Sequence, residues 1–194
     1  FMTLPLVISK DPISHRRNIG IYRMQIYGPK SAGLHWQTHK GGAAHMRTGK
    51  DLKVQKMEVA IALGSDPCTI WSGSLPLPPD MDEFAISGVL RGKSVDVVKC
   101  KTIDIEVPAE SEIILEGYVE PGQVRSEGPF GDHTGYYSMQ EDYPEFHLNT
   151  ITHRNNPIYP ATVVGRPPSE DFFMGKAAER LMLPAFKMTL PEIV

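Results

Sequence analysis

Short apolar runs, many alternating with polar residues, recur along the chain and are separated by Gly, Pro and Asp. The runs are rich in Ile, Val, Tyr and Thr, residues that favour extended backbone. Their lengths and turn-like boundaries are typical of β-strands. The pattern predicts strands at 3–8, 20–27, 33–37, 58–63, 69–73, 94–99, 103–107, 112–118, 146–153 and 161–164.

Two segments instead carry apolar residues at helical spacing. One is expected to begin after Asp80 as N-cap, with Glu83 at the capping-box position. The other follows Ser169 and is expected to end at Pro184, because proline removes a helical hydrogen bond. A weaker pattern predicts a short helix after Gly42. Since strands outnumber helices, we expect a β-dominated α+β fold with peripheral helices.

The composition fits one globular domain without a strongly charged surface. The 194 residues can bury a core, and 20 Lys and Arg balance 23 Asp and Glu, which argues against nucleic-acid binding. Cys68 and Cys100 lie far apart, as expected of buried thiols in a reducing compartment, so we expect a cytoplasmic protein. No apolar run reaches membrane-spanning length. Both ends are apolar, starting at Phe1, so residues 1–194 look like one domain cut from a longer polypeptide.

The segment 126–137 concentrates candidate chemistry. Glu127 and Asp132 flank a Gly-Pro-Phe-Gly turn, and His133 follows. The turn would fold the two carboxylates toward one point, where like charge raises the pKa of one of them. Such a carboxyl can hold and release a proton near neutral pH. The alternative is a solvated turn whose acids are ordinary surface charges.

Arg23 and Gln25 place polar groups in the middle of the predicted strand 20–27. An unpaired buried charge is too costly to keep, so Arg23 either lies on a wet sheet face or binds a carboxylate or phosphate. Strict alternation sets Asn18 on the opposite face from Arg23. A joint site therefore requires a bend, which Gly20 is expected to supply.

The segment 35–42 ends in a Lys-Gly-Gly turn. Lys40 and the glycines would present an ammonium and backbone N–H groups to a phosphate. His39 is either a metal ligand or a solvent-facing histidine. Trp36 is more typical of a core than of a cofactor-binding wall.

Glu83 follows a proline-rich segment in which four residues around the prolines are expected to be locked in an extended conformation, giving a rigid lead into a helix N-terminus. Its acid group has two interpretations. It is either the capping-box residue of a helix or, together with Asn18, part of an oxygen-rich site suited to Mn²⁺ or Mg²⁺.

Taken together, these segments resemble the UbiD family of prenylated-flavin-dependent decarboxylases in order and spacing. The matching segments are 18–23, 35–42, 74–78 with Glu83, 127–136, 158–165 and 167–171. The likeness covers nearly the whole chain. Family members are much longer, so the chain resembles their central cofactor-binding domain, for which the resemblance implies a split β-barrel of the flavin-binding type.

The resemblance also implies site residues. Prenylated FMN would contact Ile21, Tyr22, Arg23, His35, Trp36, Gln37, Lys40 and Gly41. A divalent metal, Mn²⁺ or Mg²⁺, would be held by Asn18, His39 and Glu83, and K⁺ by backbone carbonyls of residues 72–75. The catalytic network would be Arg23, Glu127 and Asp132, with Asp132 as the proton donor. Many family members have Glu at this last position, and the shorter side chain bears on substrate geometry.

The activity implied is reversible decarboxylation of an aromatic or α,β-unsaturated acid, with ubiquinone or menaquinone precursors favoured. Such an enzyme would obtain its cofactor from a flavin prenyltransferase and would act as a homo-oligomer. It would associate peripherally with a membrane if its substrate is prenylated. One alternative is a flavin-binding or structural module without activity. Another is a split-barrel flavin reductase, against which Glu127 and Asp132 argue, because hydride transfer needs no carboxylate pair.

Overall fold

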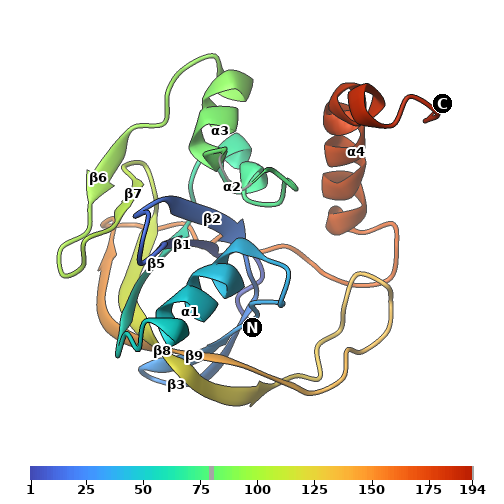
Figure 1. Ribbon diagram of the computed structural model, residues 1–194. Helices are drawn as coiled ribbons and strands as arrows, with labels where there is room; N and C mark the ends of the chain where they lie inside the picture. The colour runs from blue at the N-terminus through green and yellow to red at the C-terminus, as the bar shows by residue number, and fades with distance from the viewer. Residues whose placement is uncertain (79–80, 194) are drawn as a thin grey trace. The chain divides into compact units, whose positions relative to one another are not determined.

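The computed structural model describes residues 1–78 and 81–193, which form two compact units. Unit 1 comprises Phe1–Gly128 and Met139–Ala161, and unit 2 comprises Pro129–Ser138 and Thr162–Val194. The expectation of a single domain over 1–194 stays a prediction, and each unit is described by itself. Unit 1 contains the sheets and three of the labelled helices, and unit 2 contains helix α4 (Glu170–Thr189) (Figure 1).

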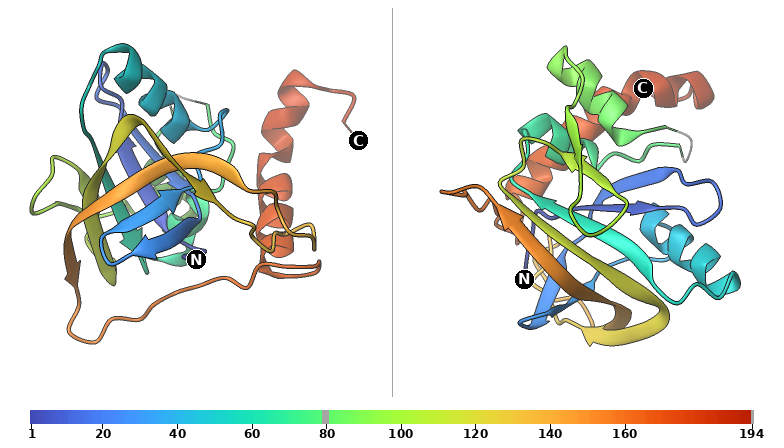
Figure 2. Two further views of the ribbon diagram at one scale, coloured as in Figure 1. Left: turned by 90° about the horizontal axis from the view of Figure 1, so that it is seen from below. Right: turned by 90° about the vertical axis from the view of Figure 1, so that its left-hand side faces the viewer.

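Unit 1 is built on a seven-stranded antiparallel sheet with the order β2-β1-β5-β8-β9-β4-β3. The strands are β1 (Leu6–Lys10), β2 (Arg17–Ile21), β3 (Met24–Gly28), β4 (Ser31–Leu34), β5 (Met57–Leu63), β8 (Ile113–Glu127) and β9 (Glu141–His153). Figure 2 shows that β8 and β9 curve strongly, and their pairing shifts register twice. A second, two-stranded sheet pairs β6 (Val97–Lys99) with β7 (Glu106–Pro108).

The two edges of the large sheet are β2 and β3, although only two residues connect these strands. A single bridge between Met2 and Met24 joins the start of the chain to β3. The β-dominated α+β class is confirmed. Within the described residues the ladders form no closed barrel, so the split barrel remains a prediction.

Both faces of the sheet are buried, as the alternation along β5 shows. Its odd-numbered residues, 57 to 63, join one apolar cluster, which also contains Trp36 and Ala43 of helix α1 (Gly41–Asp51). Ala60 and Ala62 point the other way and join a second cluster with Phe84 of helix α3 (Glu83–Arg91). The helices α1 and α3 are therefore anchored to opposite faces of the sheet.

Three strand predictions are wrong. Residues 69–72 belong to helix α2 (Pro67–Ser72), because Asp66 accepts the Cys68 N–H at 2.9 Å and Pro67 occupies the first helical position. The expected strand 20–27 is divided into β2 and β3 by a break at residues 22–23. Residues 161–164 form no strand.

Two helix boundaries also differ from prediction. Helix α3 begins at Glu83 with Asp82 as N-cap, while Asp80 lies outside the described residues. Glu83 is thus the first helical residue and not the capping-box acid, which would stand three residues after the cap. Helix α4 runs through Pro184 to Thr189 instead of ending at the proline. An interior proline removes one hydrogen bond, and the turns on both sides of Pro184 remain helical.

Unit 2 consists of the turn region 129–138 and the segment that leads into α4. A bridge between Gly131 and Tyr137 closes the turn region. Thr162 and the Val163 N–H both donate to Glu170, which ties the segment before α4 to the first turn of that helix. Among the described helices, none is long and apolar enough to cross a membrane.

Candidate functional site

The Arg23 guanidinium, the Glu127 carboxylate and the His35 imidazole meet within unit 1. Arg23 lies in the break between β2 and β3, Glu127 ends β8, and His35 directly follows β4. Arg23 Nε donates to Glu127 Oε1 at 2.8 Å, and Arg23 Nη2 donates to Oε2 at 3.2 Å. His35 Nδ1 lies 2.9 Å from Oε2 and carries the hydrogen, because a carboxylate only accepts. Glu127 is therefore fixed by a bidentate arginine and a histidine.

The bend that this arrangement requires lies at Tyr22 and Arg23, not at Gly20. Gly20 stays within β2, opposite Val7 of β1. A Cβ on Gly20 would lie 2.4 Å from the Tyr22 ring. Glycine is needed there to make room for the tyrosine, and the change of direction occurs after β2 has ended.

Glu127 is a buried anion, with 1% of its surface exposed. Burial acts to raise the pKa of Glu127, but the hydrogen bonds from His35 and Arg23, with the charge of Arg23, outweigh it and hold that pKa below its usual value. Glu127 is consequently not the acid with a raised pKa that the pattern of segment 126–137 predicted. Its geometry suits it to orient and balance charge rather than to donate a proton.

Tyr143 on β9 belongs to this constellation and was not identified from the sequence. Its ring lies 4.2 Å from the His35 ring, centroid to centroid, and its hydroxyl donates to Glu141. Burial, together with Glu141, raises the pKa of Tyr143. The pairing of Glu127 with Glu141 across β8 and β9 brings the tyrosine here, and no local sequence pattern reveals that pairing.

The N-terminus of α1 forms a narrow backbone cradle. Lys40 is the N-cap, and its side chain makes no capping hydrogen bond. A Cβ on Gly41 would lie 1.7 Å from Asn18 Oδ1, and one on Gly42 would lie 2.4 Å from the Trp36 ring. Trp36 Nε1 is buried and has no hydrogen-bond partner among the described residues. The first-turn N–H groups, the indole N–H and the Lys40 ammonium provide donors suited to a phosphate.

Asn18 provides an oxygen atom beside this cradle, and Glu83 provides carboxylate oxygens at the first turn of α3. Asn18 Nδ2 donates to the Tyr22 hydroxyl at 3.2 Å, which leaves Asn18 Oδ1 facing Gly41. Burial raises the pKa of Glu83 to about 7, the neighbouring Asp82 adds to the shift, and a hydrogen bond from the Ile19 N–H opposes it. Glu83 Oε2 is buried without a partner among the described residues.

The donor set of Asn18 and Glu83 fits a hard divalent cation. Carboxylate and amide oxygens suit Mn²⁺ or Mg²⁺, and a cation would both satisfy the orphaned Glu83 oxygen and lower the pKa of that carboxyl. His39 is exposed in the loop before α1, and its part in such a site stays a prediction. Within the described chain, no three His, Cys, Asp or Glu side chains gather to hold a metal ion.

Asp132 lies in unit 2, within the turn region 129–138. Its carboxylate accepts the His133 N–H at 2.7 Å, and its Oδ1 lies 2.8 Å from His133 Nδ1. Its backbone closes a turn in which the Gly135 N–H donates to the Asp132 carbonyl at 3.0 Å. In the same unit, burial raises the pKa of Asp171, with His133 opposing and Asp132 reinforcing the shift.

The other predicted site residues lie around the same features of unit 1. Ile21 ends β2 and is partly buried, Tyr22 is buried in the break, and Gln37 is exposed after β4. The structure thus brings Arg23, Glu127 and His35 together, and separately Asn18, Tyr22 and Gly41. It places His35 on the acid network, whereas the family resemblance implies a flavin contact for this residue.

Comparison with known proteins identifies relatives of this chain. The family model for the UbiD 3-octaprenyl-4-hydroxybenzoate carboxy-lyase Rift-related domain matches residues 1–167. A protein from Archaeoglobus fulgidus is 53% identical over 194 residues, covering 100% of this chain and 40% of that protein. The chain therefore spans about 40% of the length of this curated relative.

Two solved structures share the fold at appreciable sequence identity. An evolved dimeric form of the UbiD-class enzyme HmfF from Pelotomaculum thermopropionicum, in complex with prFMN, has a TM-score of 0.88 and 30% identity, covering 98% of this chain and 44% of that chain. The vanillic acid decarboxylase of Sedimentibacter hydroxybenzoicus in closed form has a TM-score of 0.85 and 29% identity, covering 89% of this chain and 37% of that chain.

Proposed function

Because the chain belongs to the UbiD family of carboxy-lyases, we propose that it is the cofactor-binding part of a prenylated-FMN-dependent decarboxylase. The observation that carries the proposal is the buried Arg23–Glu127–His35 constellation, found in the same unit as a phosphate cradle. The similar HmfF structure is a complex with prFMN, which supports a flavin here. The substrate proposed is an aromatic or α,β-unsaturated carboxylic acid.

The cofactor phosphate would be held at the N-terminus of α1. The backbone N–H groups of Gly41 and Gly42, the Lys40 ammonium and the Trp36 indole N–H supply donors, and the absence of side chains at the two glycines permits close approach. Asn18 and Glu83, with His39 as the third expected ligand, would hold Mn²⁺ or Mg²⁺ against that phosphate.

A K⁺ site at the carbonyls of residues 72–75 is part of the same proposal. The Ser72 carbonyl already accepts the Leu75 N–H at 3.2 Å, and the Gly73 carbonyl accepts the Ile21 N–H at 3.1 Å. Each carbonyl oxygen has a second lone pair, so these bonds are compatible with binding a cation.

The cofactor, when bound, supplies the reactive carbon centre that accepts electron density from the substrate as CO₂ leaves. Arg23, held in place by Glu127, orients the substrate carboxylate. Glu127 remains ionised because Arg23 and His35 stabilise its charge. Asp132 delivers one proton to the carbon that loses CO₂, so that a carboxylate and a proton are converted into CO₂ and the decarboxylated product. Preorganised charges of this kind contribute about 10²–10³ in rate.

The finer proposals concern the complete protein. We infer that a flavin prenyltransferase supplies the cofactor, that the enzyme is a cytoplasmic homo-oligomer, and that a quinone-precursor acid is the favoured substrate. A prenylated substrate would bring the enzyme to a membrane surface. These proposals rest on family membership.

The test uses the full-length protein co-expressed with a flavin prenyltransferase. The purified protein should carry a shifted flavin absorbance, and variants Gly41→Ala and Glu83→Gln should purify with less flavin. Ordinary FMN bound with NAD(P)H-dependent flavin reduction would favour a reductase instead. A full-length protein that binds no flavin under these conditions would favour a structural module.

A further inference from the structure

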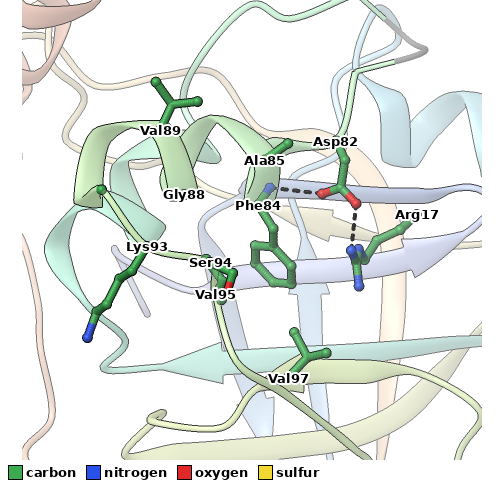
Figure 3. A pocket seen from close by; sticks show the side chains of 11 residues that line it. Arg17, Asp82, Phe84, Ala85, Gly88, Val89, Lys93, Ser94, Val95 and Val97 are labelled. Atoms are coloured by element: carbon green, nitrogen blue, oxygen red, sulfur yellow. Dashed lines mark hydrogen bonds and ion pairs between the residues drawn. The ribbon is translucent and has the colours of Figure 1, made fainter.

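An ion pair links the strand that carries Asn18 to the helix that carries Glu83. Arg17 Nη2 of β2 donates to Asp82 Oδ2 at 2.5 Å, and Asp82 Oδ1 accepts the Phe84 N–H at 2.8 Å (Figure 3). One oxygen of Asp82 therefore caps α3 while the other binds β2. The two residues also line one end of an apolar cleft of about 570 Å³ beside α3.

Further contacts fix the Arg17 side chain on both sides. Its guanidinium carbon lies 4.6 Å from the centre of the Phe84 ring, and Nη1 donates to Glu106 Oε2 of β7 at 3.4 Å. Arg17 keeps 20% of its side chain exposed, and Asp82 keeps 41%. An ion pair so exposed adds little to stability by itself. Because several contacts hold both side chains in place, the pair is suited to fixing the position of β2 relative to α3.

Each partner of the pair is the immediate neighbour of a candidate metal ligand. Arg17 precedes Asn18, and Asp82 precedes Glu83. Asn18 and Glu83 are far apart in the sequence, so their separation in space depends on how β2 holds the first turn of α3. The pair also places a cation beside two adjacent acids, Asp82 and Glu83, which would otherwise repel each other.

We propose that Arg17 and Asp82 are positioning residues that hold Asn18 and Glu83 at the spacing needed to chelate a divalent cation. This inference rests on the proposed function, since it assumes that Asn18 and Glu83 bind the metal. Both Asp82 oxygens are already engaged, one by Arg17 and the other by the Phe84 N–H, so the proposed role of the pair is to position the ligands and not to bind the ion. Removing groups that orient metal ligands costs about 10–100-fold in metal affinity.

The test measures Mn²⁺ affinity of the FMN-loaded full-length protein by electron paramagnetic resonance of free Mn²⁺. Asp82→Asn is the principal variant, because asparagine also caps helices and so retains the cap while losing the charge. It should weaken Mn²⁺ binding about 10-fold or more, as should Arg17→Ala, and Arg17→Lys should recover part of the loss. The matched control is Asp104→Asn, which breaks the exposed ion pair between Lys99 Nζ and Asp104 Oδ1 at 2.8 Å. This variant should bind Mn²⁺ with wild-type affinity.

The outcomes separate the clamp formed by Arg17 and Asp82 from the metal site itself. Asn18→Ala and Glu83→Gln should abolish Mn²⁺ binding; wild-type affinity in both would overturn the metal site and the clamp together. If those two variants lose Mn²⁺ while Asp82→Asn and Arg17→Ala bind it with wild-type affinity, the metal site stands and the clamp is refuted. Circular dichroism and thermal unfolding of Asp82→Asn should match the wild type. A loss of fold in that variant would show a structural role and refute the positioning role.

Discussion

Replacing Arg23 by alanine should destabilise the protein strongly and in a pH-dependent way. The substitution leaves the Glu127 carboxylate buried, with 1% of its surface exposed. Of its two hydrogen-bonding partners, Arg23 and His35, only His35 remains. Breaking a buried ion pair by removing one partner costs about 3–5 kcal/mol. Because His35 keeps its 2.9 Å hydrogen bond, we expect the lower end, about 3 kcal/mol at pH 7.

The pH dependence follows from the pKa of Glu127, which is lowered in the folded protein from its ordinary value of 4.5. A carboxyl whose folded pKa is depressed stabilises the protein above its unfolded pKa, and this stabilisation is lost as pH falls through the folded value. In Arg23→Ala the pKa of the buried Glu127 should instead rise. The difference in stability between variant and wild type should therefore shrink as pH falls from 7 toward 4.

The assay is urea unfolding of both proteins at a series of pH values. Arg125→Ala is a matched control, since Arg125 pairs with Glu145 at 3.1 Å while 49% of its side chain is exposed, and it should cost less than about 1 kcal/mol. The double variant Arg23→Ala/Glu127→Gln should regain much of the lost stability, because no buried charge remains. The reasoning is refuted if Arg23→Ala costs no more than Arg125→Ala, or if its cost does not change with pH.

Three further predictions address proton delivery, the cradle and the helix behind it. Asp132→Asn in the cofactor-loaded enzyme should lower turnover at least about 10²-fold while the flavin spectrum is retained, and wild-type turnover would contradict its role as proton donor. Gly41→Ala should purify with less flavin than the wild type, because the new Cβ would lie 1.7 Å from Asn18 Oδ1. Gly175→Ala, where nothing lies within 4 Å of the new Cβ, is the control, and unchanged flavin content in Gly41→Ala would contradict the phosphate cradle. His45 of α1 is buried, and its Nδ1 lies 3.0 Å from the Ser9 hydroxyl oxygen. Burial lowers the pKa of His45 below 6.5, while the charge of Asp11 acts to raise it. The unfolded chain therefore binds a proton more readily, so thermal stability should fall as pH drops below about 6.5, and His45→Gln should flatten that dependence; an unchanged pH profile in the variant would count against it.

The fold class could be predicted from the sequence because strand patterns and turn residues are local signals. The buried runs of β1 and β5 stand out in this way. The strand prediction at 69–73 is wrong because Thr69 and Ile70 favour strands, and they outweigh the local signal that decides for α2, which is Asp66 followed by Pro67. Asp82 caps α3 in the same way, but the sequence offers Asp80 as an equally plausible N-cap two residues earlier, so the start of this helix was predicted too early.

The candidate site was predicted less completely, since its geometry depends on contacts between distant segments. Family-specific motifs identified Arg23 and Glu127, and the structure shows that they bind each other. The role of His35 as a partner of Glu127, and the presence of Tyr143, depend on the pairing of β8 with β9 and β4 with β9. No periodicity within one strand reveals the register of another strand.

Release of CO₂ by the full-length protein, loaded with prenylated flavin, tests the central claim most directly. The enzyme is supplied with a panel of aromatic and α,β-unsaturated acids labelled with ¹³C at the carboxyl group. We predict labelled CO₂ from at least one acid with the wild type, and none above background with Asp132→Asn. A fully loaded wild-type enzyme that releases no labelled CO₂ from any acid, while its flavin is reduced by NAD(P)H, would contradict the account.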